Sequence, residues 1–484
     1  MAKRALAIDL GSTSIRVGLV SRSGIVSSVL SQQLTVDKPS TGEVQLDANE
    51  IANIALTLSK QILNGEEGVS SIGITCQRAS TVVFDPLTGE PVGPVLSWQD
   101  LRTVFDCLGL QNEGLFLAPN QSATKARWLV NSSGREASEL AFATLETWFT
   151  WKLSNGADFV TDRSNASLTG LINLDAKSWS FGDMATLGLS GLQMPEIVPT
   201  MGQLATAQAL PGSLPITALV GDQPASLFGQ GGSLAGTKIT FGTGAMLDMV
   251  DGTTGPEHLR RFESGCFPTV LRSMGDEITW GFEAAVLSAG SCVQWLVDGM
   301  GLCRDLDEVE ALATSVPSTD GVYFIPAFNG LGTPKWDFGA RGAFLGLSQG
   351  TTRAHMVRAV LEGVAHRGAD LLDAARVQSG KEISEIRVDG GMSVNTYFTQ
   401  FLADITSTRV CVSDEREATL RGAGLMALVG IGELSVEEVG QMTNYARIHE
   451  PQVDADLASL VRFEWASMVE RSEKTIPGLS SISF

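Results

Sequence analysis

Two glycine-rich stretches, each following an apolar run, have the composition of phosphate-binding turns. The first is "DLGSTSIR" (residues 9–16) and the second is "FGTGAM" (residues 241–246). Backbone N–H groups at such a turn can bind phosphate oxygens, and neighbouring hydroxyl groups add donors. Either stretch alone is explained more simply as an ordinary hairpin, but the pair favours a phosphate clamp. Its candidate ligands are Gly11, Ser12, Thr13, Gly242 and Thr243.

Two carboxylates stand where they can take part in chemistry with a bound phosphate. Asp9 ends the first apolar run, a position from which it can hold Mg²⁺ through water. Asp222 ends another apolar run in "VGDQPAS", just before Pro224. Taken alone, Asp222 is more simply the N-cap of a helix that begins near the proline. Opposite a phosphate clamp, its carboxylate can instead accept the proton of a hydroxyl group as a γ-phosphoryl group is transferred to it.

"VDGGMSVN" (residues 388–395) is a candidate nucleotide site. It has the pattern of a strand, two glycines and a helix start, which lets a nucleotide approach the backbone near a helix N-terminus. A plain strand-to-helix turn explains the stretch equally well. "GGSLAGTKIT" looks superficially like a Walker A loop, but it lacks the GK[ST] ending. If the chain binds ATP, we therefore expect a site other than a P-loop.

Polar side chains also follow a buried strand in "GITCQRASTVVFD", where Arg78 stands next to Ala79. Ends of strands in α/β sheets commonly present ligand-binding groups. The stretch "SWQDLRT" then places three polar or aromatic side chains at an expected loop. Substrate contact and a solvated turn explain these three equally well, and they are Trp98, Asp100 and Arg102.

The elements that must position these residues alternate between strand-like and helix-like patterns, which predicts an α/β fold. Residues 5–34 have the pattern of three consecutive strands with Gly and Ser at the turns. A helix is expected to follow up to residue 63, with Asp47 as its N-cap.

An internal repeat divides the chain. "TKITFGTGAMLDMV" (residues 237–250) restates the opening pattern of apolar strand, small polar turn and apolar strand. A repeat of this length predicts two domains of the same fold that face each other across a cleft. We place the domains at residues 1–231 and 232–484.

Composition limits the classes of protein. The 484 residues are 43% hydrophobic and 18% charged, as in a globular protein, and the formal net charge of −20 argues against nucleic-acid and anionic-membrane partners. The six cysteines show no metal-like spacing and are expected to be reduced and buried, and the four histidines to be structural or on the surface. With no signal peptide or membrane-length apolar run, we expect a cytoplasmic protein. Whether it forms a homo-oligomer is left open.

Taken together, the motifs resemble the FGGY family of carbohydrate kinases over nearly the whole chain, and within it the glycerol kinases. The supporting stretches, in family order, include "DLGSTSIR", "GITCQRASTVVFD", "SWQDLRT", "GDQPASLFGQ", "FGTGAMLDM", "SAGSCVQWL", "GAFLGLSQGTTRAHMVRAVLE" and "RVDGGMSVNTYFTQFLADI". The resemblance implies two actin-like, ribonuclease-H-type domains with an active site in the cleft between them. It also implies ATP and Mg²⁺ as cofactors and a small polyol or ketose as substrate.

The resemblance also implies roles for individual residues. Asp9 matches the acid associated with Mg²⁺, and Asp222 matches the catalytic base, with Gln223 beside it at the substrate. Arg78 and Trp98 match residues of the acceptor site. The matches to nucleotide and phosphate contacts are Thr13, Gly242, Thr243, Gly290, Gln294, Gly391 and Asn395.

The acceptor site is where this chain departs from glycerol kinases. Ala79 stands where they usually have glutamate, Asn120 where they have tyrosine, and Met246 where an aromatic side chain lines the pocket. Loss of the carboxylate removes a hydrogen-bond partner for a terminal hydroxyl, which costs a ligand about 1–3 kcal/mol. We therefore expect a larger or differently oxygenated acceptor than glycerol, such as a four- or five-carbon polyol or ketose.

Three alternatives remain on the sequence alone. These are a true glycerol kinase, a non-catalytic regulator that binds ATP or sugar on the same fold, and a chaperone-like ATPase. Retention of both Asp9 and Asp222 argues against a pure binding protein. The chaperone alternative is disfavoured because no distinct peptide-binding domain follows the second half.

Overall fold

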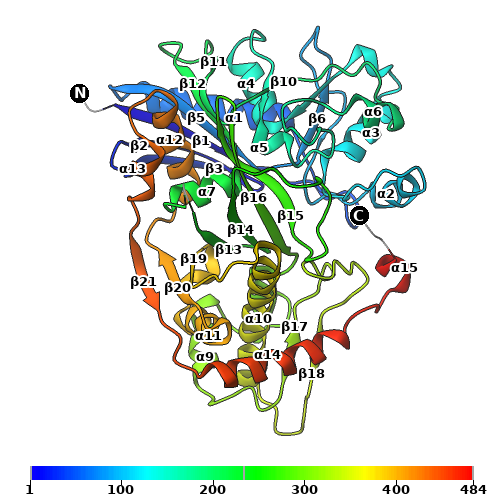
Figure 1. Cartoon of the computed structure of the whole chain (residues 1–484), viewed down its shortest axis with the longest axis vertical. Helices are drawn as coiled ribbons and strands as arrows, with labels where there is room; N and C mark the ends of the chain where they lie inside the picture. Colours follow the sequence, from blue (N-terminus) through cyan, green and yellow to red (C-terminus); the bar gives the residue numbers. More distant parts are fainter. Residues whose placement is uncertain (1–2, 233–234, 482–484) are drawn as a thin grey trace.

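The computed structural model describes residues 3–232 and 235–481, so short parts of both predicted domains lie outside the described residues. Its main feature is a mixed sheet of 13 strands in the order β21-β20-β19-β13-β14-β16-β15-β11-β12-β5-β1-β2-β3. Figure 1 shows the strands of the first half in the upper part of the molecule and those of the second half below them.

The first half of the sequence contributes strands and helices in alternation. Its strands are β1 (Arg4–Leu10), β2 (Ser14–Ser21), β3 (Val26–Gln33), β4 (Gln45–Leu46), β5 (Val69–Cys76), β6 (Thr81–Phe84), β7 (Val95–Leu96), β8 (Ala141–Thr144), β9 (Val160–Asp162), β10 (Glu196–Val198), β11 (Met201–Thr206) and β12 (Pro215–Gly221). Its helices are α1 (Ala48–Leu63), α2 (Val104–Gln111), α3 (Ser122–Ser133), α4 (Leu145–Leu153), α5 (Arg163–Ala166), α6 (Phe181–Thr186) and α7 (Asp222–Gly229), with a short 3₁₀ turn at Ala137–Glu139.

The second half follows the same alternation. Its strands are β13 (Thr237–Phe241), β14 (Ala245–Gly252), β15 (Phe267–Met274), β16 (Glu277–Val286), β17 (Tyr323–Ile325), β18 (Ala343–Leu345), β19 (Glu385–Asp389), β20 (Arg409–Ser413) and β21 (Tyr445–His449). Its helices are α8 (Gly290–Asp298), α9 (Leu306–Thr314), α10 (Arg353–Ser379), α11 (Thr396–Thr406), α12 (Ala418–Gly430), α13 (Val436–Gly440), α14 (Ala455–Glu470) and α15 (Pro477–Ser480), with a 3₁₀ turn at Gly391–Val394.

The two halves repeat one arrangement of five strands, as the internal repeat predicts, and each adds an antiparallel strand beside the last of the five. In the first half β1, β2 and β3 are antiparallel neighbours, β5 and β12 continue parallel to β1, and β11 is antiparallel to β12. In the second half β13, β14 and β16 are antiparallel, β19 and β20 continue parallel to β13, and β21 is antiparallel to β20. The halves meet where Met201 of β11 pairs with Met274 of β15. The boundary that we place at residues 231 and 232 stays a prediction.

Local sequence explains the elements that carry the site. Residues 5–10 of β1 are buried, as expected for a strand covered on both faces of a parallel arrangement. The three strands expected over residues 5–34 are β1 to β3. Asp47 caps α1 as predicted, because its side chain accepts hydrogen bonds from the backbone N–H groups of Asn49 and Glu50.

Helix α12 belongs to the second half of the sequence but packs on the first half of the sheet. Its side chains Leu420 and Ala423 share a buried cluster with Ala5, Ala7 and Val20 of β1 and β2. Figure 1 shows the orange α12 beside these strands at the upper left. The core of the first half therefore includes a segment from the second half of the sequence.

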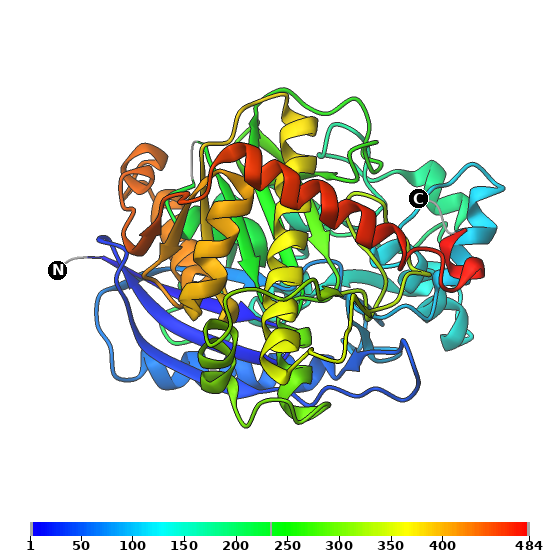
Figure 2. The same ribbon diagram turned by 90° about the horizontal axis from the view of Figure 1, so that it is seen from below.

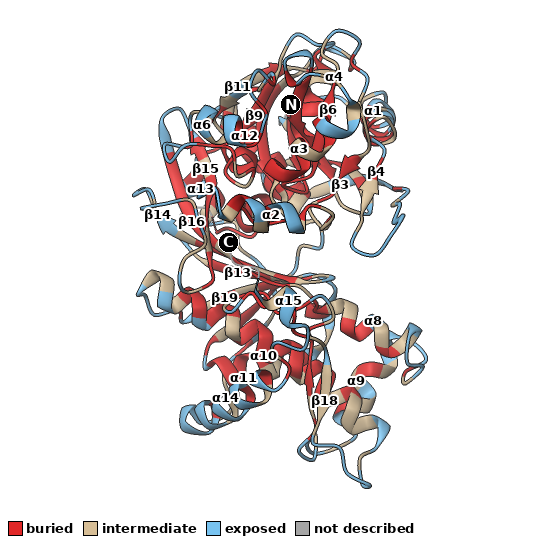
Figure 3. Cartoon of the chain, turned by 90° about the vertical axis from the view of Figure 1, so that its right-hand side faces the viewer, coloured by how far each residue is buried: buried red, intermediate tan, exposed pale blue. Residues whose placement is uncertain are grey.

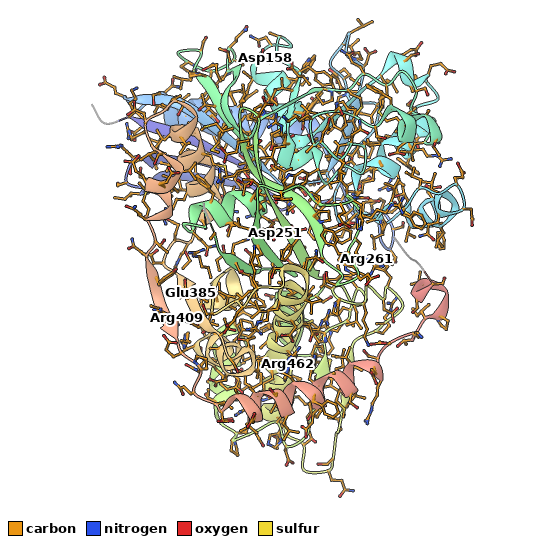
Figure 4. All side chains as sticks on the ribbon, viewed as in Figure 1. Asp158, Asp251, Arg261, Glu385, Arg409 and Arg462 are labelled. Carbon is orange, nitrogen blue, oxygen red and sulfur yellow. The ribbon has the colours of Figure 1, made fainter. Side chains whose placement is uncertain are left out.

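Helices cover the faces of the second half of the sheet. Seen from below, the red α14 crosses over α10 and α11 (Figure 2). Arg462, labelled on α14 in Figure 4, donates from Nη1 to Nδ1 of His366 on α10 over 3.1 Å, and the ring of His366 stacks on Trp465 at 4.6 Å between centroids. This contact joins the long central helix to the C-terminal one.

Buried residues gather along the sheet and on the helix sides that face it, while loops and outer helix faces are exposed (Figure 3). All six cysteines are buried and unpaired, as expected. Among the described helices, none combines the length and apolar character that a membrane crossing requires.

Candidate active site

The two predicted phosphate-binding turns are the tips of equivalent hairpins, β1–β2 and β13–β14. In the first turn the N–H of Gly11 donates to the carbonyl of Ser14 over 3.1 Å. A Cβ on Gly11 would lie only 2.8 Å from that carbonyl oxygen, so the tight turn requires glycine. Thr13 is exposed at the tip, where its backbone and hydroxyl groups are accessible to a phosphate.

The second turn lies against the predicted nucleotide residues. The N–H groups of Ala289 and Gly290 donate to the carbonyls of Thr243 and Gly242, each over 2.9 Å. A Cβ on Gly290 would lie 2.5 Å from the Gly242 carbonyl, so only glycine allows α8 to begin this close to the hairpin.

The stretch around Gly391 completes this group. Gly390 packs against the backbone of Phe241, which precedes the second turn, and it has φ of +88°. A Cβ built on Gly391 would meet no atom within 4 Å, so the backbone there is open to a ligand. The structure thus brings Gly242, Gly290 and Gly391 together from three separate elements.

Two predicted nucleotide contacts have partners within the protein. The amide of Gln294 donates to Asp298 over 2.7 Å on the surface of α8. Asn395 is the N-cap of α11, since its side-chain oxygen accepts from the N–H of Phe398 over 2.9 Å. Their roles toward a nucleotide stay predictions, and Asn395 has a structural role as well.

Asp9 is buried at the end of β1 and faces Arg16 across the hairpin. Its Oδ2 lies 2.8 Å from Nη2 of Arg16, whose Nη1 is 2.9 Å from Glu417. Burial raises the pKa of Asp9 to about 6, the Arg16 guanidinium opposes this rise, and the Asp222 carboxylate adds to it. The effect of Asp222 on this pKa indicates that the two acids lie in one electrostatic environment.

The donors around Asp9 fit a Mg²⁺ ion that is held mainly by phosphate oxygens and water. Oδ2 of Asp9 accepts no well-aligned hydrogen bond, despite the nearby Arg16. Within residues 3–232 and 235–481, no group of three or more His, Cys, Asp or Glu side chains is arranged to hold a metal. A single carboxylate with substrate phosphates is the usual arrangement for Mg²⁺ in kinases.

Asp222 is the first residue of α7, and the N-cap is Gly221, so Asp222 is not the N-cap that the isolated pattern suggests. Its Oδ1 accepts from the N–H of Gln223 over 2.9 Å and lies 3.5 Å from Nε of Arg78. The side chain is 29% exposed, so the carboxylate remains accessible to a substrate. The structure therefore brings the predicted base and the predicted acceptor-site arginine together.

Arg78 lies nearly buried between the two halves of the sequence. Its Nη2 forms an ion pair with Glu283 of β16, and its Nη1 lies 3.5 Å from the hydroxyl of Thr269 on β15. A Cβ on Gly221 would overlap the Arg78 side chain, so glycine before Asp222 makes room for the arginine.

Ala79, Trp98 and Asn120 surround the same corner of the first half. Ala79 has φ of +60° and its side chain is buried. Nζ of Lys125 donates to the carbonyls of Ala79 and Asn120 over 3.3 and 2.9 Å, which links the two positions. Trp98 donates from Nε1 to the hydroxyl of Ser12 over 3.2 Å and so lies beside the first phosphate turn.

Burial of Lys125 is complete and lowers the pKa of its amine to about 7, although the Asp100 carboxylate acts in the opposite direction. This amine has backbone carbonyls as its hydrogen-bond acceptors. These hydrogen bonds indicate that the Lys125 amine holds the backbone in place at Ala79 and Asn120.

Met246 lies on β14, in the second half of the sequence. It packs with Ala285 of β16 and with Ala118, two residues before Asn120, in one apolar cluster that also contains Trp336. Lys125 thus links Ala79 to Asn120, and Met246 shares a cluster with a residue near Asn120.

Gln223 is held by a buried charge. Nζ of Lys238 on β13 donates to Oε1 of Gln223 over 2.8 Å and to Thr240 over 2.7 Å, and it lies 3.2 Å from Asp248 of β14. Lys238 and Asp248 are both fully buried. This pair connects the start of α7 to the second hairpin.

The sequence favoured substrate contact and a solvated turn equally for Asp100 and Arg102. In the structure the two side chains form an ion pair. Asp100 is fully buried and accepts from the N–H of Val44 over 2.7 Å, while Nη2 of Arg102 lies 2.8 Å from its carboxylate. Arg102 also stacks over Trp128 at 4.6 Å. These contacts favour a structural role in the turn over contact with a substrate.

Four charged residues of this region were missed by sequence reasoning: Arg16, Lys125, Lys238 and Glu283. Arg16 stands within "DLGSTSIR", and a hairpin register that pairs it with Asp9 would have identified it. Lys238 pairs with Asp248 across the second hairpin in the same way, so the register of that hairpin would have identified it too. Glu283 acts through Arg78, which is 205 positions away, and the sequence carries no signal for this contact.

A hollow with a volume of about 810 Å³ lies elsewhere on the surface. It is bordered by the segment before α1 and by the loop that contains Pro91 and Pro94. None of the predicted site residues borders it. We therefore define the candidate active site by its contacts rather than by this hollow.

Comparisons with known proteins identify the family of the chain. Residues 4–229 match the N-terminal domain of the FGGY family of carbohydrate kinases, and residues 237–431 match the C-terminal domain of that family. The chain is 37% identical to a glycerol kinase of Rhodopirellula baltica, over 98% of this chain and 92% of that protein, and 38% identical to one of Dechloromonas aromatica, over 96% and 97%.

Solved structures give the same result for the fold. A glycerol kinase of Plasmodium falciparum with ADP superposes with a TM-score of 0.89 at 25% identity, covering 97% of this chain and 98% of that one. A xylulose kinase of Lactobacillus acidophilus superposes at 0.84 with 17% identity and 97% coverage of both chains, which concerns the fold alone. The chain belongs to the FGGY family of carbohydrate kinases, which are ATP-dependent phosphotransferases.

Proposed function

We propose that this kinase transfers the γ-phosphoryl group of ATP to a terminal hydroxyl of a four- or five-carbon polyol or ketose in preference to glycerol. The observation that carries the proposal is Ala79, a short side chain directly after Arg78, whose guanidinium lies beside Asp222. Lys125 links Ala79 to Asn120, and Met246 shares an apolar cluster with Ala118, two residues before Asn120. A carboxylate and two aromatic rings at these positions would leave less room and favour a smaller acceptor.

Asp222 is the residue to which the proposal assigns proton transfer. Its accessible carboxylate accepts the proton of the acceptor hydroxyl as that oxygen attacks the γ-phosphorus. The two hairpin turns hold the phosphates through backbone N–H groups, and the open backbone at Gly391 receives the nucleotide. Mg²⁺ near Asp9 would neutralise charge on the phosphates when bound. Most of the rate enhancement then comes from positioning and electrostatics.

The missing carboxylate at residue 79 is the main argument against glycerol as the preferred acceptor. A small triol depends on each of its few hydroxyl contacts, and an unmet contact costs about 1–3 kcal/mol, or roughly tenfold to a hundredfold in kcat/KM. A longer acceptor can form contacts beyond this point. The other candidate function is a true glycerol kinase, which is favoured by the names of the relatives that are 35–38% identical.

A substrate panel in an ADP-release assay distinguishes the two. Glycerol is compared with four- and five-carbon polyols and with four- and five-carbon ketoses at saturating ATP. We expect the highest kcat/KM for one of the longer compounds. Glycerol as the best acceptor would reject the proposal and establish a glycerol kinase.

Ala79→Glu tests the structural argument directly. Because Ala79 already has a Cβ in the left-handed region, glutamate adds little further backbone strain at φ of +60°. We expect the ratio of kcat/KM for glycerol to that for the longer acceptor to rise about tenfold or more, with KM for ATP nearly unchanged. Ala455→Glu, at an exposed position in the first turn of α14, is the matched control and should leave the ratio unaltered.

A further inference from the structure

Arg78 stands between two carboxylates and contacts them unequally. It is in close contact with Glu283, whereas its Nε is 3.5 Å from Oδ1 of Asp222. Charge-assisted hydrogen bonds between nitrogen and carboxylate oxygen usually measure about 2.7–2.9 Å. Arg78 is therefore engaged by Glu283 and only loosely associated with the proposed base.

Glu283 is placed to act on the acceptor side of the site. It lies on β16, opposite Asp248 of β14 and Phe267 of β15. Side chains along a strand alternate between faces, so Glu283 points to the same face as Ala285, which pairs with Met246. The Glu283 side chain is 14% exposed, so it is largely withdrawn from solvent.

Removing the charge on Glu283 would take away the carboxylate partner of Arg78. Arg78 is only 6% exposed and always charged, and a buried guanidinium without a carboxylate partner is strongly unfavourable. The remaining carboxylate in contact with it is Asp222, and a guanidinium can occupy both oxygens of a carboxylate at once. Both oxygens of Asp222 would then accept hydrogen bonds from a cation, which lowers the affinity of the carboxylate for the proton of the acceptor hydroxyl.

We propose that Glu283 is a positioning residue of the acceptor site, which holds Arg78 away from Asp222 and so keeps the Asp222 carboxylate available to the acceptor hydroxyl. This inference rests on the proposed role of Asp222 as the base. It does not depend on which polyol or ketose is the preferred acceptor.

The charged groups that face Glu283 give the inference a pH signature. They are Arg78, Asp222 and Asp248, the last of which is paired with Lys238. Burial raises the pKa of Glu283 to about 7, Arg78 opposes the rise, and Asp248 and Asp222 add to it. As the pH falls through about 7, Glu283 becomes neutral and releases Arg78 toward Asp222. Acceptor kcat/KM is therefore expected to fall in the same range.

The first test compares Glu283→Gln with Glu277→Gln, an exposed glutamate at the start of the same strand. Both are assayed with the acceptor that the unaltered enzyme uses best. We expect Glu283→Gln to lower kcat/KM for the acceptor by about 10²-fold and to change KM for ATP by less than about twofold. The variant should also lose the increase in acceptor kcat/KM that accompanies a rise of the pH through about 7. Glu277→Gln should match the unaltered enzyme. Acceptor kinetics and a pH profile that are unchanged in Glu283→Gln would overturn the inference.

A double-mutant cycle with Arg78→Gln separates this role from a loss of folded protein. If Glu283 acts through Arg78, Glu283→Gln causes no further loss of kcat/KM in the Arg78→Gln background. Losses that multiply would show an independent structural role and reject the inference. Full turnover in Asp222→Asn would instead reject the proposed base, whereas a preference for glycerol would change only the assigned acceptor.

Discussion

Asp222 is the residue on which the proposed chemistry most directly depends. Asp222→Asn keeps the size of the side chain but removes its ability to accept a proton, so kcat should fall by on the order of 10²–10⁴. Because the proposal assigns the phosphates to the two hairpin turns and the nucleotide to the backbone at Gly391, ATP binding should be nearly unaffected. Steady-state kinetics and equilibrium titration with ATP measure the two effects.

Asp276→Asn is the control for this prediction, since that carboxylate is 93% exposed and pairs with Lys177 on the surface. Unchanged turnover in Asp222→Asn would remove Asp222 from its assigned role.

Residues within a short motif could be predicted, whereas residues that act through a partner on another strand were missed, whether that strand is near or distant in sequence. The turn at Gly11 and the acid at Asp9 belong to one short motif. Glu283 is 205 positions from Arg78, and nothing in the sequence around either residue records the contact. Asp222 was ambiguous for a related reason, because an aspartate before a helix has the same local pattern whether it caps the helix or faces a substrate.

At the scale of elements, close packing between α12 and α7 predicts a strong effect of adding one methyl group. A Cβ on Gly422 would overlap the backbone carbonyl of Ala225 on α7, which cannot move without shifting the helix. Gly422→Ala should therefore lower the free energy of unfolding by about 1–3 kcal/mol. Thermal denaturation followed by circular dichroism measures the change.

Gly109→Ala in α2 is the matched control, because Gly109 is exposed and a Cβ there meets no atom within 4 Å. Alanine is the better helix former, and this variant should gain up to about 1 kcal/mol. Equal effects of the two substitutions would contradict the packing that we describe.

The contact between α10 and α14 predicts a pH dependence of stability. Burial, reinforced by Arg462, lowers the pKa of His366 to about 3, whereas an unfolded histidine has a pKa near 6.5. Between these values the unfolded chain binds one more proton, so this histidine makes the folded state less stable as the pH falls below about 6.5. His366→Gln should reduce the slope of unfolding free energy against pH by up to about 1.4 kcal/mol per unit between pH 6 and 4. Identical slopes in the two proteins would contradict the buried, neutral histidine.

Elements were predictable where their pattern is complete in sequence. The opening hairpin, the repeat at β13–β14 and the N-cap at Asp47 all lie within short segments. The place of helix α12 against β1 and β2 could not be predicted, since an Ala- and Gly-rich sequence indicates close packing without indicating the partner.

At the scale of the whole molecule, the net charge of −20 predicts how ionic strength affects the two substrates differently. ATP is an anion and is repelled by an acidic protein over distances that salt screens, about 10 Å at 0.1 M. We expect kcat/KM for ATP to rise between about 20 and 150 mM KCl, while kcat/KM for an uncharged acceptor stays constant. A decrease for ATP would show that local positive potential at the phosphate turns outweighs the overall charge.

The position of α12 has a consequence for the order of events during synthesis. The first half of the sheet emerges from the ribosome with β12, but its covering helix ends only at Gly430. Synthesis adds about 5–20 residues per second, so α12 is made on the order of ten seconds or more after β12. During this time the apolar face against which α12 packs stays uncovered. A nascent chain that stalls between the two halves therefore exposes this face, and we expect it to depend on chaperones until translation has passed α12.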